Sequence, residues 1–126
     1  MSLSVDVFLV GDDGKMDLLD VPVGSSDLAG FERWRTAVWG SEATRALGAR
    51  FFPVLATGDW LKVEPSQVED FLVECALLRS NLGVVAPSAD PFKSHDEFIE
   101  QISDRLRNIE DAADRARRDG GGVVIW

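Results

Sequence analysis

The sequence of 126 residues contains one cysteine, one histidine and no tyrosine, and these shortages remove much of the chemistry that small enzymes use. A lone cysteine cannot form an internal disulfide bond, so we expect a cytoplasmic protein. One cysteine and one histidine are too few for a zinc site, whereas a carboxylate-rich magnesium or calcium site remains open. The absence of tyrosine removes a common general acid. We therefore predict no cofactor, no metal and no catalytic residue, which disfavours an enzyme.

The positions of the single histidine and the single cysteine also disfavour nucleophilic catalysis. His95 falls in the first turn of a predicted helix, where we expect it to be exposed. Cys75 falls on the apolar face of another predicted helix, where a cysteine usually behaves as a small buried hydrophobe. Arg79, one turn further on, is the only sign of the electropositive surroundings that a reactive thiol needs. No P-loop occurs, and no G-x-G-x-x-G follows a predicted strand.

Long apolar runs and basic clusters are missing as well. No apolar run approaches the roughly 20 residues that span a bilayer. The net charge is −9, which argues against affinity for nucleic acid or for an anionic membrane. Up to residue 32 the chain has seven acidic residues, and Lys15 is its only basic residue. Such a surface would steer a basic protein partner toward it, although the same charge also serves solubility.

The chain has no internal repeat and no linker, and 45% of its residues are hydrophobic, so we predict a single globular domain over residues 1–126. The pattern predicts a first hairpin with a turn at Asp13-Gly14, formed by strands near 4–10 and 16–23. It predicts a second hairpin with a turn at Thr57-Gly58, formed by strands near 50–56 and 59–63. The terminal VVIW predicts a last strand.

Capping signals predict the helices between these strands. A helix capped by Ser26 or Asp27 ends at Gly40, and a short one follows over 41–48. Two long helices cover 65–82, ended by Gly83, and 94–118, opened by a capping box. The expected fold is therefore α+β: a small, mostly antiparallel sheet of about five strands (two hairpins plus a C-terminal strand), packed by two long helices and one or two shorter ones.

The segment FERWRTAVWG, residues 31–40, is the most suggestive stretch, because it has three aromatic residues and two arginines. On a helix, Leu28, Phe31, Trp34 and Val38 form an apolar stripe, with Trp39 at its margin, which indicates a face packed into a core. Bases that stack on aromatic rings would need exposed rings beside a basic groove. We therefore interpret this stretch as core, and expect Trp34, Phe71 and Ile102 to lie in a sealed interior.

Two arginines interrupt these apolar faces. Arg35 lies inside the stripe of the first helix, and Arg79 lies inside the apolar face of helix 65–82. Their stems could cover apolar surface while the guanidinium groups stay in water. Alternatively they could pair with carboxylates such as Asp59 or Glu64, or form an anion site between the helices.

Helix 94–118 has a heptad seam, which predicts packing against the similar seam of helix 65–82, or homodimerisation as the rival interpretation. Helix 65–82 also has Val73 and Leu77 on the side away from its seam, which indicates that a second surface covers it, either within the fold or from a partner. Asp59 and Trp60 lie at a predicted hairpin tip, a position where exposed side chains often bind partners.

Our leading hypothesis is a small acidic binding protein that acts through protein–protein contact, for example an immunity- or antitoxin-like inhibitor of a basic partner. The alternative is a small enzyme or anion-binding domain with a pocket around Arg35 and Arg79. A third interpretation is a subunit of a structural homodimer. The candidate binding residues are Arg35, Trp39, Asp59, Trp60, Val73, Leu77 and Arg79.

Overall fold

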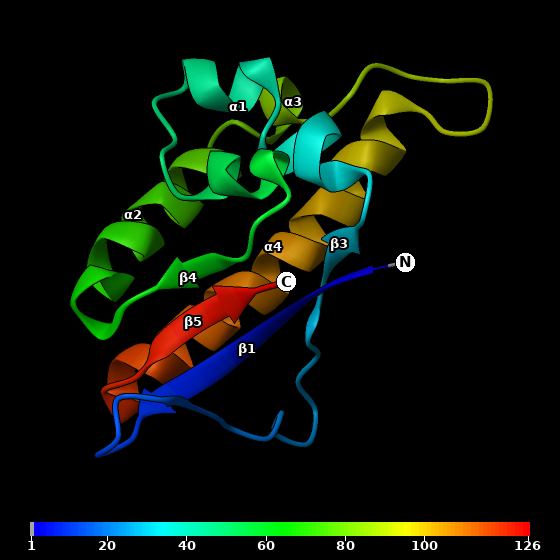
Figure 1. Cartoon of the computed structure of the whole chain (residues 1–126). Coiled ribbons are helices and arrows are strands. Elements are labelled where there is room, and N and C mark those ends of the chain that lie inside the picture. The colour runs from blue at the N-terminus through cyan, green and yellow to red at the C-terminus, as the bar shows by residue number, and fades with distance from the viewer. Residues whose placement is uncertain (1) are drawn as a thin grey trace.

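The computed structural model describes residues 2–126, which form one antiparallel sheet with the helices packed along it (Figure 1). The strands are β1 (Ser2–Val10), β2 (Met16–Leu18), β3 (Leu28–Phe31), β4 (Leu61–Val63) and β5 (Gly122–Ile125). The α-helices are α1 (Glu42–Ala46), α2 (Val68–Arg79), α3 (Leu82–Val85) and α4 (His95–Asp119). A π-helical turn (Arg35–Trp39) and two 3₁₀ segments (Phe52–Thr57 and Pro65–Gln67) complete the chain.

The strand order β2-β1-β5-β4 brings the two ends of the chain together in the middle of the sheet. Strand β5 lies between β1 and β4, and β3 pairs with the first residues of β1. All of these pairings are antiparallel. The predicted α+β class, with a mostly antiparallel sheet of about five strands, is confirmed.

Several turns and helix caps form where local sequence signals predict them. The β1–β2 hairpin turns through Gly14 with φ +78°, a backbone conformation that glycine adopts without steric cost, although its second strand ends at Leu18 rather than near residue 23. Ser94 and Glu97 form the predicted capping box at the start of α4. Ser41 caps α1 through the backbone N–H of Thr44. The terminal residues form β5 as expected.

The predicted helix from 27 to 39 is wrong in its first half. Residues Leu28–Phe31 are strand β3, and only the turn that follows is helical, ending at Gly40 as predicted. Gly30 adopts φ +121°, and a Cβ atom there would lie 2.5 Å from the Trp34 ring. Pairing with β1 and the close approach of Trp34 override the helical spacing, and Leu28 is therefore half exposed rather than core.

The predicted second hairpin is also wrong, because its first strand does not form. Residues Phe52–Thr57 are a 3₁₀ helix with Pro53 in its first turn, where proline needs no amide partner. Strand β4 pairs with β5 instead. The turn at Gly58 does form, with φ +87°. The helix predicted over 65–82 ends earlier, at Arg79, and Gly83 lies inside the short helix α3.

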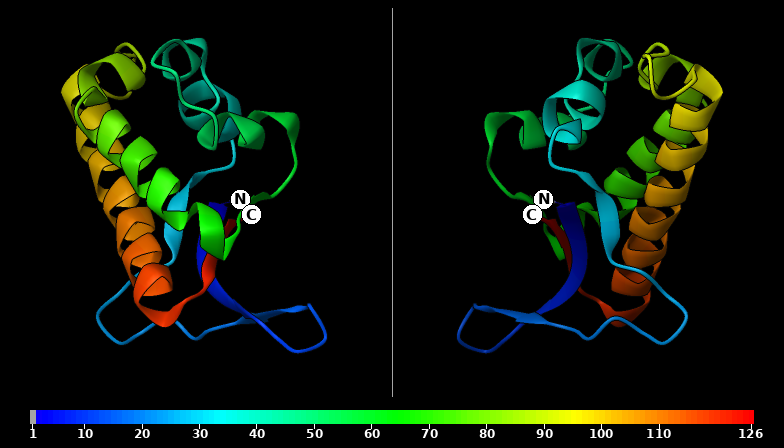
Figure 2. Two further views of the ribbon diagram at one scale, coloured as in Figure 1. Left: turned by 90° about the vertical axis from the view of Figure 1, so that its left-hand side faces the viewer. Right: turned by 90° about the vertical axis from the view of Figure 1, so that its right-hand side faces the viewer.

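The two long helices α2 and α4 lie on the same side of the sheet and pack against each other (Figure 2). Trp34, Phe71 and Ile102 are at most 1% exposed, so the expected sealed interior is present. The α4 seam from Ile102 to Ala116 is fully buried within the chain. Within residues 2–126, no helix combines the length and the apolar character that crossing a membrane requires.

Candidate functional site

Trp60 is an exposed tryptophan, with 56% of the residue accessible to solvent. It follows the left-handed turn at Gly58 and directly precedes β4. Its ring makes an edge contact with the ring of Trp126, at a centroid distance of 4.7 Å. The indole N–H of Trp126 in turn donates to the carboxylate of Asp6 in β1. The last residue of the chain therefore supports an exposed tryptophan at the edge of the sheet.

Arg35 holds the turn that presents Trp60. Its Nε donates to the carboxylate of Glu32 at 2.5 Å, and an Nη donates to the backbone carbonyl of Asp59 at 3.2 Å. The Arg35 side chain is only 15% exposed. The structure thus brings Arg35, Asp59 and Trp60 together, with the guanidinium group bonded to Glu32 and to the Asp59 carbonyl within the chain.

A groove of about 530 Å³ lies beside Trp60, between β4, the 3₁₀ helix Phe52–Thr57 and the start of α2. Phe51, Val54 and Leu61 supply apolar atoms to its wall. Arg50, Gln67 and Asp70 supply polar groups, and Lys62 pairs with Glu64 at 3.3 Å. Residues that line the groove are Arg50, Phe51, Val54, Trp60, Leu61, Lys62, Gln67 and Asp70.

A second hollow of about 210 Å³ adjoins the groove, because both are lined by Arg50, Phe51 and Asp70. It extends along the outer side of α2 to Val73, which is 69% exposed, and to Leu77. The two hollows make one continuous region, here called the Trp60–Val73 surface. Its residues are Arg50, Phe51, Val54, Trp60, Lys62, Asp70, Val73 and Leu77.

Glu74 fixes one wall of this surface from beneath. Its carboxylate is 7% exposed and accepts backbone N–H groups of three successive residues, Arg50, Phe51 and Phe52, at 2.5–3.1 Å. These amides open the 3₁₀ helix and would otherwise be unsatisfied. The buried charge is thus stabilised by hydrogen bonds, and it ties the segment that contains Phe51 to α2.

Glu74 was missed by the sequence reasoning, although a signal was present. It lies inside the apolar face of α2, next to Cys75 and between Phe71 and Leu78. A carboxylate in that position predicts a buried acceptor, just as the arginines in apolar faces predict paired guanidinium groups.

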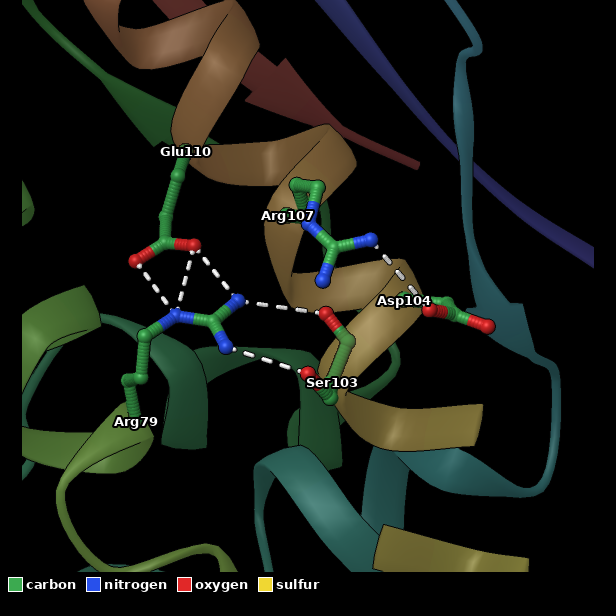
Figure 3. Close-up of polar contacts among 5 residues, drawn as sticks. All are labelled: Arg79, Ser103, Asp104, Arg107 and Glu110. Atoms are coloured by element: carbon green, nitrogen blue, oxygen red, sulfur yellow. Dashed lines mark hydrogen bonds and ion pairs between the residues drawn. The ribbon is translucent and has the colours of Figure 1, made fainter. Parts of the chain in front are cut away.

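Arg79 lies elsewhere and joins the two long helices (Figure 3). Its guanidinium group donates from Nε and Nη2 to the carboxylate of Glu110, at 2.7–3.1 Å, and also to the hydroxyl and carbonyl of Ser103. The hydrogen bonds to Glu110 raise the pKa of Arg79 above its usual value. The carboxylate partner is therefore Glu110 rather than Asp59 or Glu64. Neither hollow of the Trp60–Val73 surface is lined by Arg35 or Arg79.

Trp39 does not lie on this surface. It is completely buried, its indole N–H donates to the carbonyl of Ala29 at 3.0 Å, and its ring packs on Phe52. The structure therefore removes Trp39 from the candidate binding residues and places it in the core beneath the 3₁₀ helix.

The groups with nucleophilic or metal-binding chemistry are not gathered at the surface. Burial, and then the nearby charges of Glu110 and Glu74, raise the pKa of the Cys75 thiol well above its usual value, so the thiol stays protonated and inaccessible. His95 Nδ1 lies 2.8 Å from the carbonyl of Pro87. Within residues 2–126, no three His, Cys, Asp or Glu side chains form a cluster that could hold a metal ion.

Comparison of the chain with protein-family models, with curated proteins and with solved structures gave no match. The chemistry of the Trp60–Val73 surface is therefore the main guide to function.

Proposed function

We propose that this chain is a small, acidic, non-catalytic protein that acts by binding a protein partner through the Trp60–Val73 surface. The observation that supports the proposal is the gathering of exposed apolar side chains around two adjoining hollows. Trp60 and Val73 are both more than half exposed, at opposite ends of this region, while Phe51 and Val54 lie between them.

This composition resembles the centre of a protein interface. Interfaces are enriched in tryptophan, other aromatic residues and arginine, and a few such residues account for most of the binding energy. Here an exposed tryptophan and Arg50 flank hollows of mixed apolar and polar lining, and the polar groups would form the rim. The surface offers no activated nucleophile, since Cys75 is buried and protonated.

The partner that fits best is a basic protein. The net charge is −9, so a basic protein would be steered toward the chain over long range. A small acidic protein that covers the surface of a basic enzyme would inhibit it simply by occupation. This inhibitor role, in the cytoplasm, is the specific form of the proposal.

The test is affinity capture from a lysate of the source cells, with purified tagged protein as bait. The decisive variant is Val73→Asp, which places a charge at the α2 end of the surface. The matched control is Val23→Asp, since Val23 is fully exposed in the loop between β2 and β3. Trp60→Ala serves as a second variant at the other end of the surface.

We expect wild type and the Val23→Asp control to retain the same partner, and Val73→Asp and Trp60→Ala to lose it at least tenfold. Salt should release the partner, because charge contributes to its association. Circular dichroism of each variant checks the fold. A set of captured proteins that is the same for all four baits would overturn the proposal.

A further inference from the structure

We infer that the groove beside Trp60 receives an extended segment of the partner, which adds to the sheet as a new strand along the open edge of β4. This inference rests on the proposed function, because it specifies how the partner is bound at that surface. The occupant is a β-strand segment with a bulky apolar side chain next to a basic one.

The hydrogen-bonding pattern of the sheet shows which backbone groups β4 leaves free. Ser4 and Trp126 exchange both of their backbone hydrogen bonds. In an antiparallel pair such residues alternate with non-bonded ones, so Val124 also points its N–H and C=O toward β1. The neighbouring residues Val123 and Ile125 therefore point their backbone N–H and C=O groups toward β4.

These neighbours lie opposite Val63 and Leu61, so those two residues of β4 form the ladder with β5. Lys62, between them, must direct its backbone N–H and C=O away from the sheet. Within residues 2–126, neither group forms a further hydrogen bond. The next outward amide, that of Glu64, is already occupied by the Gln67 side chain at 3.0 Å. The open edge therefore ends at Lys62 in this direction, and by the same alternation it continues toward Trp60 in the other.

The groove lies along this same edge. Leu61 and Lys62 of β4 line it, together with Val54 of the facing 3₁₀ helix and Phe51, the residue before that helix. An unpaired N–H and C=O beside an apolar wall suits an extended chain, whose main chain pairs with the edge while alternate side chains enter the hollow. A helix could not use these groups, because its own backbone is already hydrogen-bonded.

The charges beside the groove select the flanking residue of that segment. Lys62 pairs with Glu64 at 3.3 Å, which leaves Asp70 as the acidic residue and Arg50 as the basic residue of the rim that form no ion pair within residues 2–126. A basic side chain next to the apolar one would pair with Asp70, in agreement with the basic partner inferred from the net charge of the chain.

The edge is short and has a lysine, two features that protect natural sheets from unspecific edge pairing. They also limit strand addition to a few hydrogen bonds, at Lys62 and toward Trp60. Affinity must then come mainly from the apolar side chain in the groove, and the backbone bonds set the direction and register of the segment.

The experiment uses the whole protein and a phage-displayed library of random dodecapeptides as the probe. Enriched peptides are synthesised, and their affinities are measured by fluorescence anisotropy for wild type, Lys62→Ala and Lys62→Pro. Both substitutions remove the lysine side chain, but only proline also removes the outward N–H. The ladder with β5 is retained, because Leu61 and Val63 form it and proline is tolerated at edges.

We expect basic peptides with alternating apolar residues, bound about equally by wild type and Lys62→Ala and at least about tenfold more weakly by Lys62→Pro. In wild type, hydrogen exchange of the Lys62 amide should slow at least tenfold when peptide is bound. This second readout does not depend on the folding of the proline variant.

Equal affinity of the two Lys62 variants with unchanged exchange of the amide would overturn strand addition, and so would a library without enriched peptides. A helical bound peptide, seen by NMR, or occupation of the groove by a second copy, seen by solution mass, would overturn it too. If Lys62→Pro still captures the partner that Val73→Asp loses, strand addition fails while the proposed function stands.

Discussion

At the scale of single residues, the charged side chains inside apolar helix faces are the most informative feature of this chain. Glu74 and Arg79 both lie on the buried side of α2, within about one turn of each other. Each is satisfied by partners far away in the sequence: three backbone amides for Glu74, and the carboxylate of Glu110 for Arg79. A buried charge without such partners would be very costly, so Glu74 constrains how α2 packs, whereas Arg79 is partly exposed and adds a link to α4.

The substitution Glu74→Gln should destabilise the protein by about 1.5–3 kcal/mol. Glutamine replaces one of the two acceptor oxygens by an NH₂ group, which is a donor. In one orientation this NH₂ group faces the backbone N–H groups of Phe51 and Phe52, and in the other it faces those of Arg50 and Phe51. Urea unfolding measures the effect. The control is Glu69→Gln, an exposed residue in the first turn of α2, for which we expect about 0.5 kcal/mol or less. Equal effects of the two substitutions would contradict the role assigned to Glu74.

Cys75 should make stability fall at alkaline pH. Its pKa is raised in the folded state above the usual 9.0, mainly by burial. Below that value both states keep the proton, and the full stability is present. Above it the unfolded chain loses the proton while the folded chain retains it, so stability decreases by about 1.4 kcal/mol per pH unit. Unfolding by urea between pH 8 and 10 checks this, and Cys75→Ala should have a flatter profile.

At the scale of elements, short strands and 3₁₀ segments depend on partners that lie far away in the sequence. The long helix α4 and the β1–β2 hairpin could be predicted, because a capping box and an Asp-Gly turn are local signals. The strand β3 and the 3₁₀ helix Phe52–Thr57 could not, since pairing with β1 and the buried carboxylate of Glu74 decide their conformation.

The same distinction holds for the candidate site. Trp60, Val73 and Leu77 could be predicted from a turn signal and from a second apolar side on α2, and the structure places all three on one surface. The wall that Arg50 and Phe51 share could not be predicted. The pattern of residues 50–56 predicts a strand, whereas the distant carboxylate of Glu74 fixes the conformation at its start. Trp39 at the margin of a helical stripe gave no sign of whether it would be buried.

Gly30 is the residue in β3 that we expect to tolerate substitution least. Gly30→Ala places a Cβ atom in an unfavourable backbone region and 2.5 Å from the Trp34 ring, so it should cost more than about 2 kcal/mol. The matched control is Gly14→Ala, which has φ +78° but no heavy atom within 4 Å of the new Cβ. It should cost about 1 kcal/mol in thermal or urea unfolding. A similar cost for both would refute the packing argument.

The ion pair between Arg79 and Glu110 should contribute modestly to the packing of α2 on α4. The side chains are 34% and 22% exposed, so solvent screens their attraction. A double-mutant cycle with Arg79→Met and Glu110→Gln should give a coupling energy of about 1 kcal/mol. The exposed pair of Arg117 and Asp114 provides the comparison, with an expected coupling below about 0.5 kcal/mol. A larger coupling for the exposed pair would contradict this interpretation.

At the scale of the whole molecule, the helix seam, the proposed binding surface and the acidic hairpin lie in different parts of the fold. The seam of α4 is buried in the chain itself, so a homodimer would have to use another surface. The Trp60–Val73 surface lies at the β4 edge of the sheet, whereas the acidic β1–β2 hairpin lies at the opposite edge. The two regions can therefore be changed independently of each other.

Because the two regions are separate, long-range electrostatic attraction of the partner can be distinguished from direct contact with it. Asp12, Asp17 and Asp20 are exposed in and around the β1–β2 hairpin, away from the groove. Their replacement by asparagine changes the net charge from −9 to −6, since three carboxylates become amides. For the partner captured through the Trp60–Val73 surface, we expect the association rate at low salt to fall by a factor of about 2–5, with little change in dissociation. Val73→Asp should instead accelerate dissociation, because it disrupts contacts that exist only in the complex. Surface plasmon resonance at two salt concentrations measures both rates. If the hairpin variants changed only dissociation, the acidic hairpin would be in contact with the partner, and long-range attraction would not be its role.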